Sequence, residues 1–328
     1  MASKMQAIKI SQPVDTKDLV PEWVARPVIK AGYVLIKVKA FGVNESEVTS
    51  RKGESSADFS YPRILGIEGV GVVAEVGENS SFEIGQKVAT MMGGLGRAID
   101  GSYADYTLVK EENVIPITTS LDWGTIGALP EMLQTAYGSL SRGLNLQKNE
   151  TLLIRGGSST VGLMAASLAQ HFGATVISTS RHAESLTSLK KYGATYPLLD
   201  DQDFEKNMQQ IAPDGVDKVL ELVGTTTLLQ DINFLKAGGK LCFTGALSGK
   251  WTLDDFSPFM IPTGIFLTSY AGEAKDLPAK VFNDILAEIE RGTVVVPIAK
   301  VYHGLAEVGQ AQANLESGQY SGKHVVVL

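Results

Sequence analysis

Short apolar runs separated by helical patterns fill the middle of this 328-residue chain, and they constrain its fold more than any other feature. Strand and helix that alternate at this spacing predict a parallel sheet covered on both faces, and right-handed crossovers make such a sheet doubly wound. The strands are predicted at 151–155, 175–179, 196–200, 217–222, 240–245 and 264–270, and the helices between them at 160–172, 182–192, 203–211 and 225–236.

The flanking parts of the chain have a different pattern. VLIKVKAFGVN alternates apolar and polar residues as a half-buried strand does, and EGVGVVAEVG continues with glycines that favour tight bends. Helices are predicted at 278–291 and 305–317, and the final GKHVVVL is predicted to be a strand of the N-terminal module. We therefore predict a β-rich domain over 1–121 and 271–328, and an α/β domain over 122–270.

Charge and cysteine content exclude several functions. The chain has 29 Lys and Arg against 36 Asp and Glu, a formal charge of −7, which argues against nucleic acid or an anionic membrane as the main partner. Cys242 is the only cysteine, so an intrachain disulfide and a multi-cysteine zinc site are both impossible. The N-terminus lacks the apolar core of a signal peptide and no run is long enough to span a bilayer, so a cytoplasmic protein is expected.

The strand predicted at 151–155 ends in GGSSTVG, which has the form of a dinucleotide-binding turn. Gly157 and Gly162 occupy the first and third glycine positions of that fingerprint, and Ser159 occupies the second. A helix that begins near Thr160 aims its free N–H groups at phosphates. The predicted phosphate-binding residues are Gly156, Gly157, Ser158, Ser159, Thr160 and Val161. A glycine-rich turn that binds nothing is the alternative.

The end of the second strand of the α/β domain indicates which coenzyme binds. An NAD site has Asp or Glu there for the ribose 2′-hydroxyl, whereas an NADP site offers a cation to the 2′-phosphate. This chain has Ser180 and Arg181, with no carboxylate before Glu184. We predict NADPH, bound in part by Ser180 and the planar fork of Arg181. A solvated arginine at a helix start is the alternative.

Several ordered motifs resemble the medium-chain dehydrogenase/reductase superfamily. They are FGVNESEV, YPRILGIEGVGVVAEVG, GSYADYTLV, GALPEMLQTAYGSL and the glycine turn, and the similarity extends to GKHVVVL. Within the superfamily the chain is most similar to the zinc-independent quinone oxidoreductase branch, which includes zeta-crystallin-like proteins. The resemblance implies a Rossmann dinucleotide-binding domain beside a β-rich, GroES-like catalytic domain.

The chain departs from the zinc-dependent relatives at the metal ligands. Those relatives have a Cys followed by His where this chain has Asn44 and Glu45, and a second ligand His where it has Ile67. The four-cysteine structural lobe is also missing, so neither zinc site is expected. Without a Lewis acid, the remaining chemistry is hydride transfer to a quinone or to the β-carbon of an α,β-unsaturated carbonyl.

The resemblance also suggests catalytic residues. Asn44 occupies a position that faces the nicotinamide in the family, and its amide could donate to a carbonyl oxygen. Tyr61 could donate a proton in the same cleft. The alternatives are a turn-forming asparagine and a packing tyrosine. Many relatives carry a tyrosine a few residues after the glycine that matches Gly53, where this chain has Glu54, Ser55 and Ser56.

Further cofactor contacts follow from the family pattern and from the rule that parallel sheets bind ligands at the carboxyl ends of their strands. Thr135 matches a threonine near the nicotinamide, and Tyr196 resembles a residue near the adenosine phosphate, although it could simply pack. The loops after the fourth and fifth strands supply Val223, Gly224, Thr244, Gly245, Ala246 and Leu247.

The predicted edge strand at 264–270 is long and apolar, so it would be hazardous if left bare. Because the family commonly joins two such edges, we expect a homodimer, the alternative being an edge covered by the chain's own C-terminal helix.

The rival functions are an enoyl-thioester reductase and a cofactor-binding protein with little turnover. The first would need a basic patch for coenzyme A, and the second is favoured by the missing tyrosine.

Overall fold

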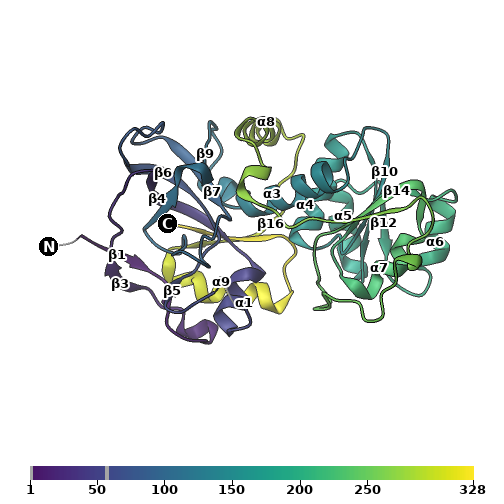
Figure 1. Ribbon diagram of the computed structural model, residues 1–328, viewed down its shortest axis with the longest axis horizontal. Coiled ribbons are helices and arrows are strands. Elements are labelled where there is room, and N and C mark those ends of the chain that lie inside the picture. The colour runs from purple at the N-terminus through teal and green to yellow at the C-terminus, as the bar shows by residue number, and fades with distance from the viewer. Residues whose placement is uncertain (1–2, 56–58) are drawn as a thin grey trace. The chain divides into compact units, whose positions relative to one another are not determined.

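The computed structural model describes residues 3–55 and 59–328, which divide into two compact units (Figure 1). Unit 1 contains the described residues up to 134 together with 273–291 and 298–328, and unit 2 contains 135–272 and 292–297. The boundary follows Gln134, not residue 121 as the sequence suggests. The reason is that α2 (Trp123–Gly127) packs on unit 1, where Gly127 lies against Ala40 and Val325.

Unit 2 is built on a parallel sheet with the strand order β12-β11-β10-β13-β14-β15 among the residues described. This order reverses between β10 and β13, as in a doubly wound Rossmann sheet, and it confirms the predicted α/β fold. The strands are β10 (Thr151–Arg155), β11 (Thr175–Ser180), β12 (Tyr196–Leu199), β13 (Val216–Glu221), β14 (Leu235–Phe243) and β15 (Phe266–Ser269).

Two apolar clusters lie in this unit. In the first, Leu153 of β10 and Val219 of β13 pack with Phe204 of α6 and Leu228 of α7. Figure 1 shows these two helices beside the strands. A second cluster joins Leu163 of α4 to residues of α5 and the turn after it. The helical segments of unit 2 are η3 (Ser139–Gly143), α4 (Thr160–His171), η4 (Ala183–Ser185), α5 (Leu186–Lys191), α6 (Phe204–Ile211), α7 (Thr225–Ile232) and η5 (Pro258–Met260). The helix α3 (Pro130–Gly138) begins in unit 1 and ends in unit 2.

One predicted helix of unit 2 is shorter than expected. The pattern over 225–236 predicts a single helix, but α7 ends at Ile232 and Leu235 already pairs with Val216 in the sheet. The apolar spacing continues past Ile232 because Leu235, which begins β14, also packs in the core and is therefore apolar.

Unit 1 contains a mixed sheet with the strand order β16-β17-β4-β6-β7-β9, while β8 also pairs with β4. The C-terminal strand β17 lies antiparallel to β4 and parallel to β16, so the yellow end of the chain lies among the purple and blue N-terminal strands in Figure 1. This β-rich GroES-like unit agrees with the sequence analysis. Its strands are β1 (Lys4–Ala7), β2 (Lys9–Ile10), β3 (Glu22–Ala25), β4 (Tyr33–Val43), β5 (Arg63–Ile64), β6 (Glu68–Val76), β7 (Lys87–Met91), β8 (Tyr106–Lys110), β9 (Val114–Pro116), β16 (Ile298–His303) and β17 (Lys323–Val327).

Short helices complete unit 1. The helix α1 begins after Asn44, whose side chain forms a reciprocal capping box with Glu47, and it ends at Gly53 in the left-handed conformation. Its remaining helical segments are η1 (Thr16–Asp18), α1 (Glu45–Lys52), η2 (Glu111–Asn113), α2, η6 (Ala274–Asp276), α8 (Ala279–Glu290), η7 (Leu305–Glu307) and α9 (Val308–Ser317).

Candidate functional site

The glycine turn of unit 2 is a tight cradle at the carboxyl end of β10. Gly156 has a φ of +74°, which favours glycine, and a side chain there would meet Leu247 at 2.8 Å. A Cβ on Gly157 would collide with the Ser178 hydroxyl and lie 3.1 Å from the Thr179 nitrogen. At Gly162 it would lie 2.7 Å from the Gly157 Cα. The turn therefore brings bare backbone to the start of α4.

Ser159 is accommodated at the second glycine position without strain. Its φ is −68°, so the turn needs no positive φ at this position and serine fits it as well as glycine does. The Ser159 hydroxyl caps α4, since it accepts from the Gly162 nitrogen at 3.1 Å and donates to the Gly156 oxygen at 2.8 Å. The first intrahelical bond runs from Leu163 to Ser159, so the amides of Thr160 and Val161 precede it and have no acceptor within α4. Amides at the start of a helix are suited to bind an anion.

The end of β11 lies against the same turn. The Ser180 hydroxyl donates to the Ser158 hydroxyl at 3.3 Å, and the Gly157 nitrogen donates to the Thr179 oxygen at 2.9 Å. Arg181 follows Ser180 and is exposed. The structure thus brings together the predicted phosphate turn and the residues predicted to select the coenzyme.

Glu221, at the end of β13, orders the two remaining loops. One of its carboxylate oxygens accepts from the nitrogens of Val223 at 2.6 Å and Gly224 at 3.0 Å. Its backbone oxygen accepts from Thr244 and Gly245 after β14. The predicted residues Val223, Gly224, Thr244, Gly245, Ala246 and Leu247 therefore lie at the same carboxyl edge of the sheet as the phosphate turn.

Two predicted cofactor residues, Tyr196 and Thr135, do not lie in the loops at the carboxyl edge of the sheet. Tyr196 begins β12 opposite Ile177, whereas Leu199 lies opposite Ser180, so Tyr196 is about 10 Å back along the strand from the carboxyl edge. Its side chain is 42% exposed, and its position fits the site least well of the predicted set. Thr135 lies in α3, and its backbone oxygen accepts from the Ser139 hydroxyl at 2.7 Å.

Asn44, in unit 1, belongs to a group of polar and charged side chains that we call the Lys323 cluster, all of them buried except Glu131, which is half-buried: Asn44, Glu47, Glu68, Glu131 and Lys323. The Asn44 side-chain nitrogen donates to Glu68 at 2.9 Å and to Glu47 at 3.3 Å. The Lys323 ammonium donates to the Asn44 amide oxygen, to Glu68 at 2.7 Å and to Glu131 at 3.2 Å. The Asn44 amide is therefore already bonded on both sides within the protein.

Burial controls the electrostatics of this cluster. Desolvation raises the pKa of Glu47 to about 7, although the Ile67 nitrogen donates to its carboxylate at 2.9 Å. Burial likewise raises the pKa of Glu68, against the opposing effect of Lys323. Burial alone would lower the pKa of Lys323, but the carboxylates of Glu68 and Glu131 outweigh it and raise that pKa, so the ammonium stays charged.

Tyr61 is also engaged within unit 1. Its hydroxyl donates to the Ser50 oxygen at 2.9 Å, its ring meets Phe59 edge-on, and burial raises its pKa. Of the segment where relatives carry a tyrosine, Glu54 and Ser55 are described and Ser56 lies outside the described residues. That Asn44 and Tyr61 act directly on a substrate stays a prediction.

Sequence reasoning missed the residues that hold these sites in place. Lys323 and Glu131 are separated by 192 positions, so no local pattern connects them. Arg155, which ends β10 next to the glycine turn, is buried and ion-paired with Asp200 and Asp231. A charged residue at the end of an otherwise apolar run was the available signal, since such a residue needs a buried partner.

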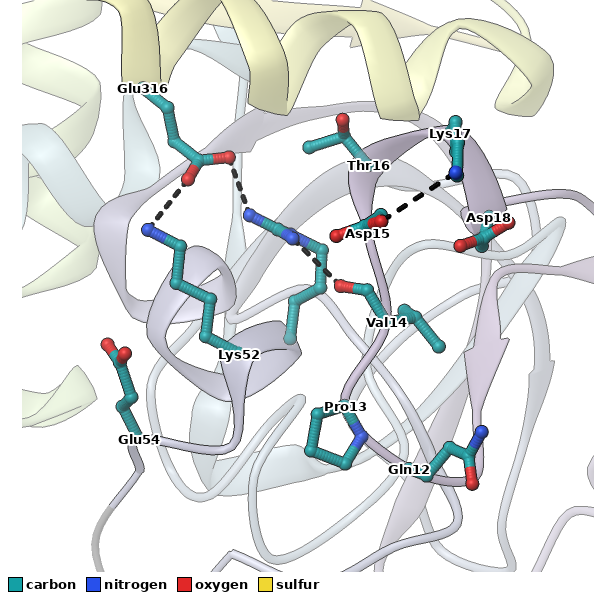
Figure 2. A pocket seen from close by; sticks show the side chains of 11 residues that line it. Gln12, Pro13, Val14, Asp15, Thr16, Lys17, Asp18, Lys52, Glu54 and Glu316 are labelled. Atoms are coloured by element: carbon teal, nitrogen blue, oxygen red, sulfur yellow. Dashed lines mark hydrogen bonds and ion pairs between the residues drawn. The ribbon is translucent and has the colours of Figure 1, made fainter.

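A polar groove of about 820 Å³ lies elsewhere in unit 1 (Figure 2). Its cations are paired with neighbours. Glu316 binds Lys52 at 2.7 Å and Arg51 at 2.5 Å, and Arg51 also donates to the Val14 oxygen. Each of its three cations, Lys17, Arg51 and Lys52, is paired with a carboxylate, so the groove is not suited to bind an anionic coenzyme.

Comparisons with known proteins agree with this architecture. Residues 160–282 match the zinc-binding dehydrogenase family, and residues 30–119 match the alcohol dehydrogenase GroES-like domain. The human quinone oxidoreductase is 26% identical over 313 residues, which cover 93% of this chain and 92% of that protein. The crystal structure of AibC superposes with a TM-score of 0.89 at 26% identity, over 100% of this chain and 96% of AibC. A mycobacterial protein solved in complex with NADPH has the same fold, with a TM-score of 0.82 at 23% identity, over 99% and 100% of the two chains.

The chain is an oxidoreductase of two units, one Rossmann-like and one GroES-like. It belongs to the medium-chain dehydrogenase/reductase superfamily, and quinone oxidoreductases are among its relatives. The superfamily typically uses a nicotinamide cofactor, and the bare backbone at Gly157 fits one, since any Cβ there would fill the cradle.

Zinc does not fit the residues present. Ile67 has no donor atom, and the Lys323 ammonium already occupies the oxygens of Asn44, Glu68 and Glu131. No group of three or more potential ligands for a metal ion was found among the described residues. Within the same part of the chain, no helix has the length and apolar character needed to cross a membrane.

Proposed function

We propose that the protein is an NADPH-dependent reductase of quinones or α,β-unsaturated carbonyls. The observation that carries the proposal is the pairing of Ser180 with Ser158 at 3.3 Å, with Arg181 next to it and no carboxylate at this strand end. A 2′-phosphate is favoured where hydroxyls and a guanidinium converge, and an acidic residue there would select NAD.

The chain's own residues bind and orient in this proposal. The amides of Thr160 and Val161 and the positive end of α4 would hold the pyrophosphate, and the loops ordered by Glu221 would hold the nicotinamide half. When bound, NADPH supplies a hydride. A quinone or enone accepts it together with one proton from solvent, so electrons and protons balance without a metal ion.

Asn44 and Tyr61 are the proposed substrate-facing residues. Each must exchange an internal hydrogen bond for one to substrate, the 3.3 Å bond to Glu47 for Asn44 and the 2.9 Å bond to Ser50 for Tyr61. Tyr61→Phe keeps the ring and removes the hydroxyl. It should lower kcat and leave the Kd for NADPH unchanged, and an unchanged kcat would remove Tyr61 from the proposal.

The decisive experiment compares the two coenzymes. NADPH consumption is followed with 9,10-phenanthrenequinone, 1,4-benzoquinone and a short enone, beside NADH. Arg181→Ala should weaken NADPH binding by about 1.5–3 kcal/mol, the contribution of a charged hydrogen bond, and leave NADH unchanged. The matched control is Lys190→Ala, an exposed cation on α5. Equal losses for both coenzymes would contradict the assignment, and tight NADPH binding without turnover would favour a binding protein.

We also propose a homodimer through β15. This strand pairs with β14 on one side, and its Phe266 is 57% exposed. An apolar strand edge of this kind is stabilised by pairing with a second copy. Light scattering should give twice the chain mass for the wild type and one chain mass for Phe266→Lys. A wild-type monomer would contradict the proposal.

A further inference from the structure

The Lys323 cluster contains an internal cation beside Asn44. The resemblance to zinc-dependent relatives matches Asn44 and Ile67 to metal ligands. In this chain the Asn44 amide oxygen accepts a hydrogen bond from the Lys323 ammonium instead. We propose that Lys323 is a tethered substitute for the metal ion, which orients Asn44 and keeps divalent cations out of the site. The inference concerns unit 1 alone and does not depend on which coenzyme binds.

The coordination of the ammonium supports this role. An ammonium group has three hydrogens, and here three oxygens surround it, from Asn44, from Glu68 at 2.7 Å and from Glu131 at 3.2 Å. These oxygens come from three segments that are distant in sequence: the start of α1, the start of β6 and the start of α3. A single cation therefore fastens three elements together, as a structural metal ion does.

The cluster is also closed around its cation. The side chains of Lys323 and Glu68 are 2% and 0% exposed. Gly42 on β4 completes the enclosure, because any Cβ there would collide with the Glu68 carboxylate and the Lys323 side chain. Buried carboxylates need a positive partner, so this arrangement requires one cation in place.

The charges show what the site would accept if the ammonium were removed. Glu47, Glu68 and Glu131 bring three carboxyl groups near one amide oxygen and one ammonium. With the ammonium in place, the described residues contain no group of three or more side chains placed to hold a metal ion. Without Lys323 the remaining donors are all oxygens, the type that Mn²⁺ and Mg²⁺ prefer, and the carboxylates that the ammonium now holds are released to bind one. Lys323 then determines whether this part of the fold binds a metal ion or a side chain.

The experiment replaces the tethered cation by a free one. Lys323→Ala is titrated with Mn²⁺, followed by electron paramagnetic resonance and by the melting temperature. We expect one Mn²⁺ per chain and a melting temperature that rises with Mn²⁺. The wild type should show neither effect. The matched control is Lys218→Ala, a buried lysine that pairs with the single carboxylate of Glu150 at 3.5 Å, and it should also bind no Mn²⁺.

Two further measurements keep the test decisive. Glu68→Gln combined with Lys323→Ala should lose the Mn²⁺ site, since a central ligand is gone. Methylammonium, which carries the missing group, should raise the melting temperature of Lys323→Ala and not that of Lys218→Ala. If Lys323→Ala does not fold alone, refolding with Mn²⁺ or methylammonium should recover it. Absence of both Mn²⁺ binding and recovery by either cation would overturn the proposal, and so would a stoichiometric Mn²⁺ site in the wild type.

Discussion

Arg155 and Asp231 form a buried ion pair in which Nε and Oδ2 are 3.1 Å apart. The same guanidinium reaches Asp200 at 3.1 Å and lies 4.2 Å from the ring centre of Phe204. Burial, reinforced by the neighbouring Glu221, raises the pKa of Asp231 well above its usual value. Because Arg155 directly precedes Gly156, this pair connects the glycine turn to the helix α7.

Breaking the pair should destabilise unit 2 strongly. Arg155→Met leaves the Asp231 carboxyl buried without its cation, and the expected loss is about 3–5 kcal/mol of unfolding free energy, measured by urea denaturation. Adding Asp231→Leu removes the stranded group, so the double variant should recover part of that loss. Purely additive losses would show that the two side chains do not act as a pair.

The cradle at Gly157 gives a second prediction. Gly157→Ala places a methyl group against the Ser178 hydroxyl and should cost about 1–3 kcal/mol in unfolding free energy through overpacking. It should also weaken NADPH binding in calorimetry, because the methyl group occupies the approach to the backbone. Ser178→Gly in the same chain should restore part of the stability. An unchanged stability would mean that the turn relaxes freely.

The two units differed in how far the sequence could predict them. Alternating strands and helices, together with GGSSTVG, were enough to predict the parallel sheet and the glycine turn after its first strand, because those features depend on neighbours in sequence. The Lys323 cluster was not predictable, since Glu68, Glu131 and Lys323 meet only after three distant segments pack together. The role predicted for Asn44 toward a substrate stays a prediction, and its bonds to Glu68 and Lys323 could not be read from the sequence. The offset of Tyr196 reflects strand register, which a local pattern does not fix.

His324 gives a pH-dependent prediction. Burial, together with Lys300 and Lys323, lowers the pKa of His324 to about 4. Its Nδ1 lies 2.9 Å from the Tyr302 hydroxyl, and Asn314 donates to the same hydroxyl oxygen, which leaves the Tyr302 hydrogen for His324. As the pH falls, His324 takes up its proton in the unfolded state before it does so in the folded state. Its contribution to the unfolding free energy is therefore complete above pH 6.5 and is lost as the pH falls toward 4.

The measurement compares unfolding free energies of the wild type and His324→Gln between pH 7 and pH 4.5. The wild type should lose roughly 2 kcal/mol more than the variant over this range. Parallel curves would show that His324 does not carry the effect.

Glu47 should act in the opposite direction. Its pKa is raised to about 7, chiefly by burial, so the folded state holds a proton that the unfolded state releases near pH 4.5. The stabilisation is therefore complete at low pH and is lost as pH rises through 7. Between pH 5 and pH 8 the wild type should lose roughly 2–3 kcal/mol of unfolding free energy relative to Glu47→Gln, which carries no charge at either pH. Glu112→Gln, at a largely exposed carboxylate, is the matched control and should follow the wild type. Glu47 and His324 have opposite effects on the unfolding free energy between about pH 5 and pH 6.5, so its pH profile should be flatter in the wild type than in either variant. A Glu47→Gln profile parallel to that of the wild type would contradict a Glu47 carboxyl that is protonated in the folded state.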